Sequence, residues 1–175
     1  MTTSLYLAMS ADGLIATPNR ISNEEWEWPD SAWEHWCSSC TTSNNLIVGR
    51  TTYEELLEDD VSDILFPEHK VVVSSQSLDL ADSWVQTSSP KQAIDYLNSC
   101  NVENIIVGGG RQIGLAFVNE GLIDDVVLDI QPILFGNGTP LLGELENCIQ
   151  LELVDIEKLA HDAIKVHYKI IKKLI

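Results

Sequence analysis

The stretch Asn104–Gly114, NIIVGGGRQIG, decides the fold of this chain. Residues 105–107 form a short apolar run, which is typical of a strand buried on both faces. Glycines at 108, 109 and 110 follow at once, and residues 111–119 then show helical periodicity. A strand that ends in glycines and opens a helix brings bare backbone N–H groups to one point, where they suit a phosphate or pyrophosphate. A tight strand-to-helix turn without a ligand would show the same pattern.

Two other places in the chain repeat this arrangement. The strand predicted at 45–48 ends at Gly49 and opens a helix with Arg50, Thr51 and Thr52. The strand predicted at 70–73 ends in a polar turn, Ser74–Ser77. Hydroxyls and an arginine at a helix start suit an anionic ligand, although a threonine there also serves as a helix cap.

The remaining periodicities predict an α/β fold. Strands are expected at 4–9, 14–16, 84–86 and 125–130, and helices near 33–40 and from Pro90 onward. The segments 151–159 and 164–170 both alternate, with His161 and Asp162 between them as a hairpin turn. A strand–helix body closed by such a hairpin predicts a central mixed, mainly parallel sheet with helices on both faces and a C-terminal antiparallel hairpin.

Composition and charge limit the kinds of protein that this chain can be. A chain of 175 residues, 45% apolar, suits a single domain over 1–175. Its formal net charge of −17 argues against a nucleic-acid partner. We find no apolar run of membrane-spanning length and no basic segment before the first apolar residues, so we expect a cytoplasmic protein. Cys37 and Cys40 form a lone CxxC at helical spacing, which indicates core packing rather than a metal site.

Four of these motifs together resemble one family. SLYLAMSADGLIA, IVGRTTYE, VVVSSQS and IIVGGGRQIG occur in that order and resemble the dihydrofolate reductase superfamily over nearly the whole chain. The later segment GLIDDVVLDIQPILFGNGTPLL looks more like the reductase domain of riboflavin biosynthesis and its stand-alone relatives. The resemblance implies a three-layer dihydrofolate reductase-like fold and an NADPH-dependent reductase.

The resemblance also implies a cofactor site. The residues it assigns to the cofactor are Ala8 and Ile15 at the nicotinamide, Gly49, Arg50, Thr51 and Thr52 at the phosphates, Ser74, Ser75 and Gln76 at the adenosine end, and Gly108, Gly109, Gly110, Arg111, Gln112 and Ile113 at the pyrophosphate and nicotinamide. Arg50 is our candidate for the 2′-phosphate, through a bidentate charge-assisted contact. The serine turn contains no basic residue, which leaves NADH open as an alternative.

The catalytic residues are harder to assign. Asp30 is the nearest candidate for the acidic residue that binds the pterin in dihydrofolate reductase, but it also suits a helix cap. Asp12 matches an aspartate of the family's loop motif, where it shapes the turn or reaches the substrate. For Trp26 and Trp28 two interpretations stay open: they form the wall of a pocket for a planar ring, or they cover an open edge. Further candidates for a cationic substrate site are Arg20 and Lys70.

Several functions are compatible with these residues. The first is hydride transfer to a ribosylamino-pyrimidine, as in the riboflavin-type reductases, and the second is reduction of a pterin. A third is an unrelated dehydrogenase with Gly108-x-Gly110-x-x-x-Gly114 as dinucleotide fingerprint and Asp129 at the ribose. A fourth is a non-catalytic nucleotide-binding protein of the same fold. The C-terminal strand HYKIIKKLI either pairs in a homodimer or is protected as an edge by its lysines.

Overall fold

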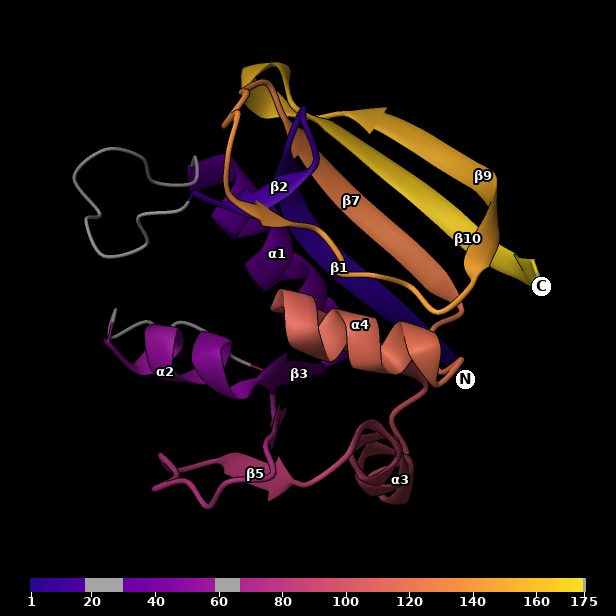
Figure 1. Ribbon diagram of the computed structural model, residues 1–175. Helices are drawn as coiled ribbons and strands as arrows, with labels where there is room; N and C mark the ends of the chain where they lie inside the picture. The colour runs from indigo at the N-terminus through magenta and orange to yellow at the C-terminus, as the bar shows by residue number, and fades with distance from the viewer. Residues whose placement is uncertain (18–29, 59–66, 175) are drawn as a thin grey trace.

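An eight-stranded sheet forms the centre of the protein (Figure 1), in a computed structural model that describes residues 1–17, 30–58 and 67–174. Its strands are β1 (Thr2–Ser10), β3 (Asn45–Gly49), β4 (His69–Val73), β5 (Trp84–Thr87), β6 (Asn104–Gly109), β7 (Asp125–Gln131), β9 (Cys148–Lys158) and β10 (Ile164–Leu174). The helices are α1 (Asp30–Ser43), α2 (Arg50–Glu58), α3 (Pro90–Ser99) and α4 (Arg111–Asn119), with a short 3-10 turn at Ala160–Asp162.

The sheet is mixed and mainly parallel, as the sequence predicts. Its order is β5-β4-β3-β6-β1-β7-β10-β9. The six strands from β5 to β7 run parallel, and β10 and β9 add an antiparallel pair at one edge. The predicted hairpin turn is confirmed, since His161 and Asp162 both have positive φ. A second, two-stranded sheet pairs β2 (Leu14–Ala16) with β8 (Thr139–Pro140), and the sequence did not indicate β8.

Helices cover both faces of the sheet, and each face has its own core. On one face, α3 and α4 pack over alternate residues of the central strands, with Leu97 and Phe117 fully buried. On the other face, α1 and α2 pack over the intervening residues through Trp36, Cys40 and Tyr53. Continuous apolar runs such as 46–48 therefore contribute side chains to both cores, which is why the parallel strands show no alternation.

The parallel topology brings the functional turns together. Strands β1, β3, β4, β6 and β7 all point the same way, so the segments that follow them meet at the carboxyl edge of the sheet. Ligands bind at this edge in open α/β sheets. None of the helices in the described ranges is long and apolar enough to cross a membrane. Arg20, Trp26 and Trp28, which the sequence analysis singled out, lie outside the described residues.

Candidate cofactor and active site

A groove of about 840 Å³ lies at the carboxyl edge of the sheet. Its walls come from the segments after β3, β4 and β6, and from β8. The lining residues are Gly49, Arg50, Thr51, Thr52, Val73, Ser74, Ser75, Gln76, Gly110, Arg111, Gln112, Ile113, Leu115 and Thr139. The structure thus brings the three predicted turns to one hollow, and it adds Thr139, a residue without a recognisable motif in the sequence.

Two helix N-termini open onto this groove. Helix α4 begins after Gly110, whose φ of +84° suits glycine, and no side chain caps the first turn. Helix α2 begins at Arg50, directly after β3. Uncapped N–H groups at a helix start favour an anion. This arrangement fits the phosphates of a dinucleotide cofactor.

Two arginines stand at these helix starts. Arg50 donates two hydrogen bonds to the carboxylate of Glu54, at 2.9 and 3.1 Å, so its exposed guanidinium is held at the mouth of the groove. The guanidinium of Arg111 lies close to Gly143, in the loop before β9. A Cβ added at Gly143 would be 3.0 Å from Arg111 Nη2. Both side chains bring positive charge to a strongly acidic chain.

The serine turn after β4 has a defined shape. The hydroxyl of Ser74 accepts from the backbone N–H of Gln76 and donates to its carbonyl oxygen. The amide of Gln86 donates to the carbonyl oxygens of Ser74 and Gln76, at 3.1 and 2.6 Å. These bonds fix the backbone of the turn and leave Ser75 exposed beside the groove.

Of the three consecutive glycines, Gly110 lines the groove, whereas Gly108 and Gly109 are buried. A Cβ at Gly108 would lie 2.5 Å from Leu46 Cδ1 and 2.9 Å from Trp36 Nε1. A Cβ at Gly109 would lie 2.8 Å from Thr52 Cγ2. These two glycines therefore let α1 and α2 approach β6 closely, a structural role that the sequence analysis did not separate from cofactor binding.

The two residues expected at the nicotinamide lie beside the groove rather than in its lining. Ala8 is near the carboxyl end of β1, in register with Asp129 of β7. Ile15 is buried in β2, which follows the turn after β1. Their positions at the same sheet edge leave the nicotinamide assignment as a prediction.

Asp12 acts as an acceptor in the turn after β1. It accepts from the hydroxyl of Ser10 at 2.6 Å and from the backbone N–H groups of Phe135 and Gly136 at 3.1 and 2.7 Å. The hydrogen bonds from Ser10 and Gly136 lower its pKa. An ionised carboxylate that joins two loops suits the turn-shaping role, and it is a poor proton donor at neutral pH.

The other predicted polar residues lie elsewhere. Asp30 begins α1, but its side chain lies outside the described residues. Lys70 is buried, with its Nζ 5.9 Å from the centre of the Trp84 ring, and it does not line the groove. Cys40 is fully buried in the α1 core, and burial raises the pKa of Cys37 to about 11, so both stay as thiols at neutral pH.

A cluster that the sequence analysis missed lies between α1 and the sheet. The hydroxyl of Tyr6 donates to Asp129 Oδ2 at 3.0 Å, and His35 Nδ1 lies 3.9 Å from the same oxygen. Asp129 is fully buried, and this burial raises its pKa against the opposing effects of Tyr6 and His35. Its place on the α1 face argues against a ribose contact near α4. Periodicity alone could not join residues from three elements.

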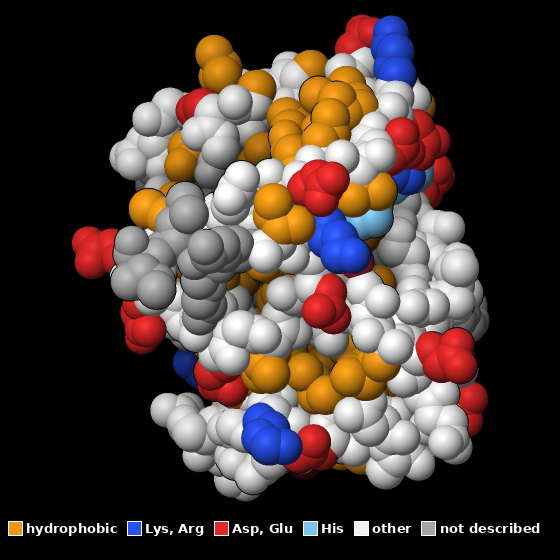
Figure 2. Space-filling model, turned by 90° about the vertical axis from the view of Figure 1, so that its right-hand side faces the viewer, with side chains coloured by type: hydrophobic (Ala, Val, Ile, Leu, Met, Phe, Trp, Pro, Cys, Tyr) orange, Lys and Arg blue, Asp and Glu red, His pale blue; other side chains and the backbone are white. Residues whose placement is uncertain are grey.

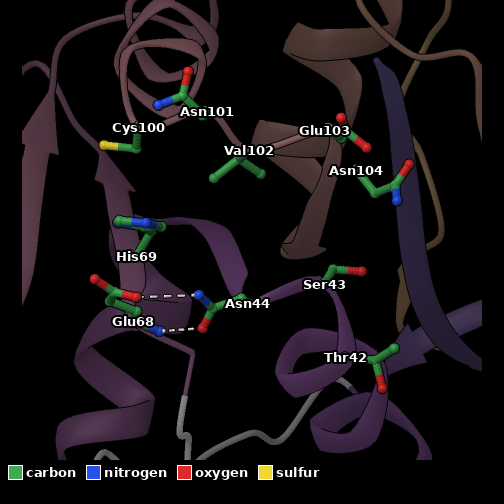
Figure 3. Close-up of a pocket in the computed structure, with 10 residues that line it drawn as sticks. All are labelled: Thr42, Ser43, Asn44, Glu68, His69, Cys100, Asn101, Val102, Glu103 and Asn104. Atoms are coloured by element: carbon green, nitrogen blue, oxygen red, sulfur yellow. Dashed lines mark hydrogen bonds between the residues drawn. The ribbon is translucent and has the colours of Figure 1, made fainter.

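A second hollow, of about 510 Å³, lies at the opposite end of the strands (Figure 3). Glu68 accepts from the amide of Asn44 at 3.3 Å, and the backbone N–H of Glu68 donates to Asn44 Oδ1 at 2.9 Å. Its walls come from the end of α1, from the loops before β4 and β6, and from His69 and Asn104, the first residues of these strands. It holds neither a helix N-terminus nor an arginine among its lining residues.

Comparison with known proteins gives a consistent result. The family model described as RibD C-terminal domain matches residues 3–165. YwjB of Bacillus subtilis (strain 168), an uncharacterized protein, is 28% identical over 171 residues, 95% of this chain and 96% of YwjB.

Two solved structures share the fold. A putative riboflavin biosynthesis protein from Shewanella sp. PV-4 has a TM-score of 0.75 at 22% identity, covering 98% of this chain and 100% of that chain. A pyrimidine reductase-like protein from Corynebacterium diphtheriae has a TM-score of 0.72 at 14% identity, covering 98% and 92%. At these identities the likeness concerns the fold.

Proposed function

Because the chain belongs to the RibD C-terminal domain family, a reductase family within the dihydrofolate reductase-like superfamily, we propose that it is an NADPH-dependent reductase of a ribosylamino-pyrimidine. The observation that carries this proposal is the groove in which three turns and two helix N-termini meet. The substrate class is proposed from membership of this family and from the fold shared with a putative riboflavin biosynthesis protein.

The proposed cofactor orientation follows from the chemistry of the groove. The pyrophosphate lies at the start of α4, against Gly110 and Arg111, where N–H groups lack a capping side chain. The 2′-phosphate lies at Arg50, and the adenosine end lies along the serine turn. When bound, the cofactor supplies a hydride. The chain's own residues bind and orient it and leave the nicotinamide near Ala8 and Ile15.

Two measurements test this function. Binding of NADPH and NADH by calorimetry tests the cofactor site, and we expect tighter binding of NADPH. Turnover with the ribosylamino-pyrimidine and with dihydrofolate then separates the two substrate classes. Tight NADPH binding without turnover of either compound would favour a non-catalytic nucleotide-binding protein.

We also propose that a second copy of the chain covers the outer strand β9. This strand has eleven residues, and Leu151, Leu153 and Ile156 are 40, 51 and 56% exposed. Their register partners in β10 include Tyr168 and Ile170, so the apolar face extends over both strands. Figure 2, which views this side of the molecule, shows apolar side chains gathered in patches between charged ones. Long exposed apolar edges are typical of protein interfaces.

The cytoplasmic location expected from the sequence stays a prediction.

A further inference from the structure

The side chains between α1 and the carboxyl ends of β1 and β7 leave several buried polar atoms without a partner. His35 Nδ1, Asp129 Oδ1 and both side-chain atoms of Gln131 have no hydrogen-bond partner among the described residues. Asp129 and Gln131 are fully or almost fully buried. Buried polar groups normally pair, so four unpaired atoms in one region point to a partner that binds there.

The cluster lies beside the expected position of the reaction. Asp129 is in register with Ala8, two residues before the end of β7, and Gln131 is in register with Ser10. Asp129, Ala8 and Tyr6 point to the same face of the sheet, because alternate residues of a strand share a face and register partners in neighbouring strands do so too. This face is the one covered by α1, which carries His35.

The geometry gives each member of the cluster a distinct role. Burial and the Asp129 carboxylate raise the pKa of Tyr6, so its hydroxyl stays protonated and donates to Oδ2. Asp129 in turn lies 3.9 Å from Nδ1 of His35. Nδ1 is buried, whereas the side chain of His35 as a whole is 34% exposed. The edge of the imidazole that solvent and substrate can reach is therefore the one away from Asp129.

We propose that His35 is the proton donor of the reduction and that Asp129 and Tyr6 are its positioning residues, an inference that rests on the proposed function. Reduction of a C=N bond adds a hydride to carbon and a proton to nitrogen. The bound dihydronicotinamide supplies the hydride and both electrons, and it is oxidised in doing so. His35 supplies the proton from Nε2 and becomes neutral, and solvent reprotonates it through the exposed edge. The 3.9 Å contact between Nδ1 and Asp129 closes to a hydrogen bond from Nδ1–H when the substrate binds, which fixes the orientation of the ring.

Titratable groups from three strands face the His35–Asp129 pair. Tyr6 comes from β1, Lys165 from β10 and Glu157 from β9. Lys165 pairs with Glu157 at 2.5 Å, so these two charges largely compensate each other. The long His35–Asp129 distance does not argue against the role, because catalytic hydrogen bonds are often long before the substrate binds.

The test compares His35→Gln with the control variant His167→Gln, which changes a histidine in a similar setting. General acid catalysis typically contributes about 10²–10⁴-fold, so we expect kcat to fall by roughly that factor in His35→Gln while the affinity for NADPH stays unchanged. The decline of kcat at high pH, where a histidine acid loses its proton, should also disappear. His167 makes a similar pair with Asp125, at 3.4 Å and 33% exposure, near the amino end of β7. His167→Gln should keep both the rate and the pH profile.

A spectroscopic readout tests the positioning residues independently of turnover. Nitrogen NMR of the His35 imidazole should show a protonated Nδ1 in the wild type and a loss of this preference in Asp129→Asn. A wild-type rate and pH profile in His35→Gln, or an unchanged Nδ1 signal in Asp129→Asn, would overturn the proposal while leaving the reductase function intact. Failure of the wild type itself to turn over any substrate would instead refute the proposed function, and with it the catalytic role of His35.

Discussion

At the scale of single residues, the proposed function assigns to Arg50 the distinction between the two nicotinamide cofactors. Its guanidinium lies at the start of α2, where the ion pair with Glu54 holds it at the groove. A hydrogen bond to a charged group contributes about 1.5–3 kcal/mol, so Arg50→Ala should weaken NADPH binding by roughly ten- to a hundredfold. NADH lacks the 2′-phosphate, and its affinity should change little.

The matched control for this variant is Lys91→Ala. Lys91 makes an equivalent pair with Asp95 on α3, at 2.8 Å, and it does not line the groove. Calorimetric titration of the three proteins with both cofactors checks the prediction. Equal weakening of NADPH and NADH by Arg50→Ala would place Arg50 at a phosphate that both cofactors share.

Asp129 should make the stability of the protein depend on pH. Its pKa is raised above the ordinary 3.8, chiefly by burial, so the folded state binds its proton more tightly than the unfolded chain does. The free energy of unfolding therefore decreases as pH rises between the ordinary and the raised pKa. Asp129→Asn removes this contribution, and its stability relative to the wild type should increase as pH rises above the ordinary pKa of the carboxyl group. Denaturant unfolding at several pH values measures the difference, and a constant difference would contradict the assignment.

At this scale, the residues of the groove were easier to predict from the sequence than the cluster around Asp129. Arg50, Thr51 and Arg111 follow predicted strands directly, so their place at the sheet edge follows from chain order. His35 and Asp129 lie 94 positions apart, and no local pattern pairs a helical histidine with a strand aspartate. Their proximity depends on the strand order, which places β1 and β7 side by side.

At the scale of secondary-structure elements, the contact of α1 with β6 depends on Gly108. Trp36 Nε1 donates to the carbonyl oxygen of Gly108 at 2.9 Å, which holds the helix against the strand. A methyl group at Gly108 meets both Trp36 and Leu46, and overpacking of this kind costs about 1–3 kcal/mol. Gly108→Ala should lower the free energy of unfolding by a value in that range.

The control for the glycine variant is Ser38→Ala, an exposed position on the same helix. It should leave the free energy of unfolding within about 0.5 kcal/mol of the wild type. Urea denaturation gives both values. If Gly108→Ala were as stable as Ser38→Ala, the close packing of α1 on β6 would be wrong.

Element boundaries followed from sequence wherever a local signal marks them. Ser89 caps α3 by accepting from the N–H of Gln92, and Pro90 begins the helix, as the sequence predicts. The two-residue strand β8 lacks such a signal, since its pairing with β2 depends on the path of the loop from 131 to 138. Gly138 allows that path, because a Cβ there would collide with the carbonyl oxygen of Ala16.

At the scale of the whole molecule, the apolar face of β9 bears on assembly. If a second copy covers this face, a charge at its centre should separate the two chains, because burying an unpaired carboxylate is costly. Ile156→Glu should therefore shift the protein from dimer to monomer, whereas Leu57→Glu on α2 should not. Light scattering after size-exclusion chromatography measures the mass, and a monomeric wild type would contradict the proposal.

The fold class itself was predictable because two signals agree over the whole chain. Each strand-to-helix turn predicts a parallel neighbour, and the alternating C-terminal segments predict the antiparallel pair. The strand order was not predictable in the same way, because it depends on long-range pairings such as β1 between β6 and β7.

We propose that the groove binds NADPH so that the chain can reduce a ribosylamino-pyrimidine. The most direct measurement follows the loss of reduced-nicotinamide absorbance in the presence of this substrate and identifies the product by mass spectrometry. We expect one equivalent of NADPH to be oxidised for each ribityl product, and a slower reaction with Arg50→Ala at limiting NADPH. An unchanged NADPH concentration in the presence of the pyrimidine, despite a saturated cofactor site, would contradict this proposed function.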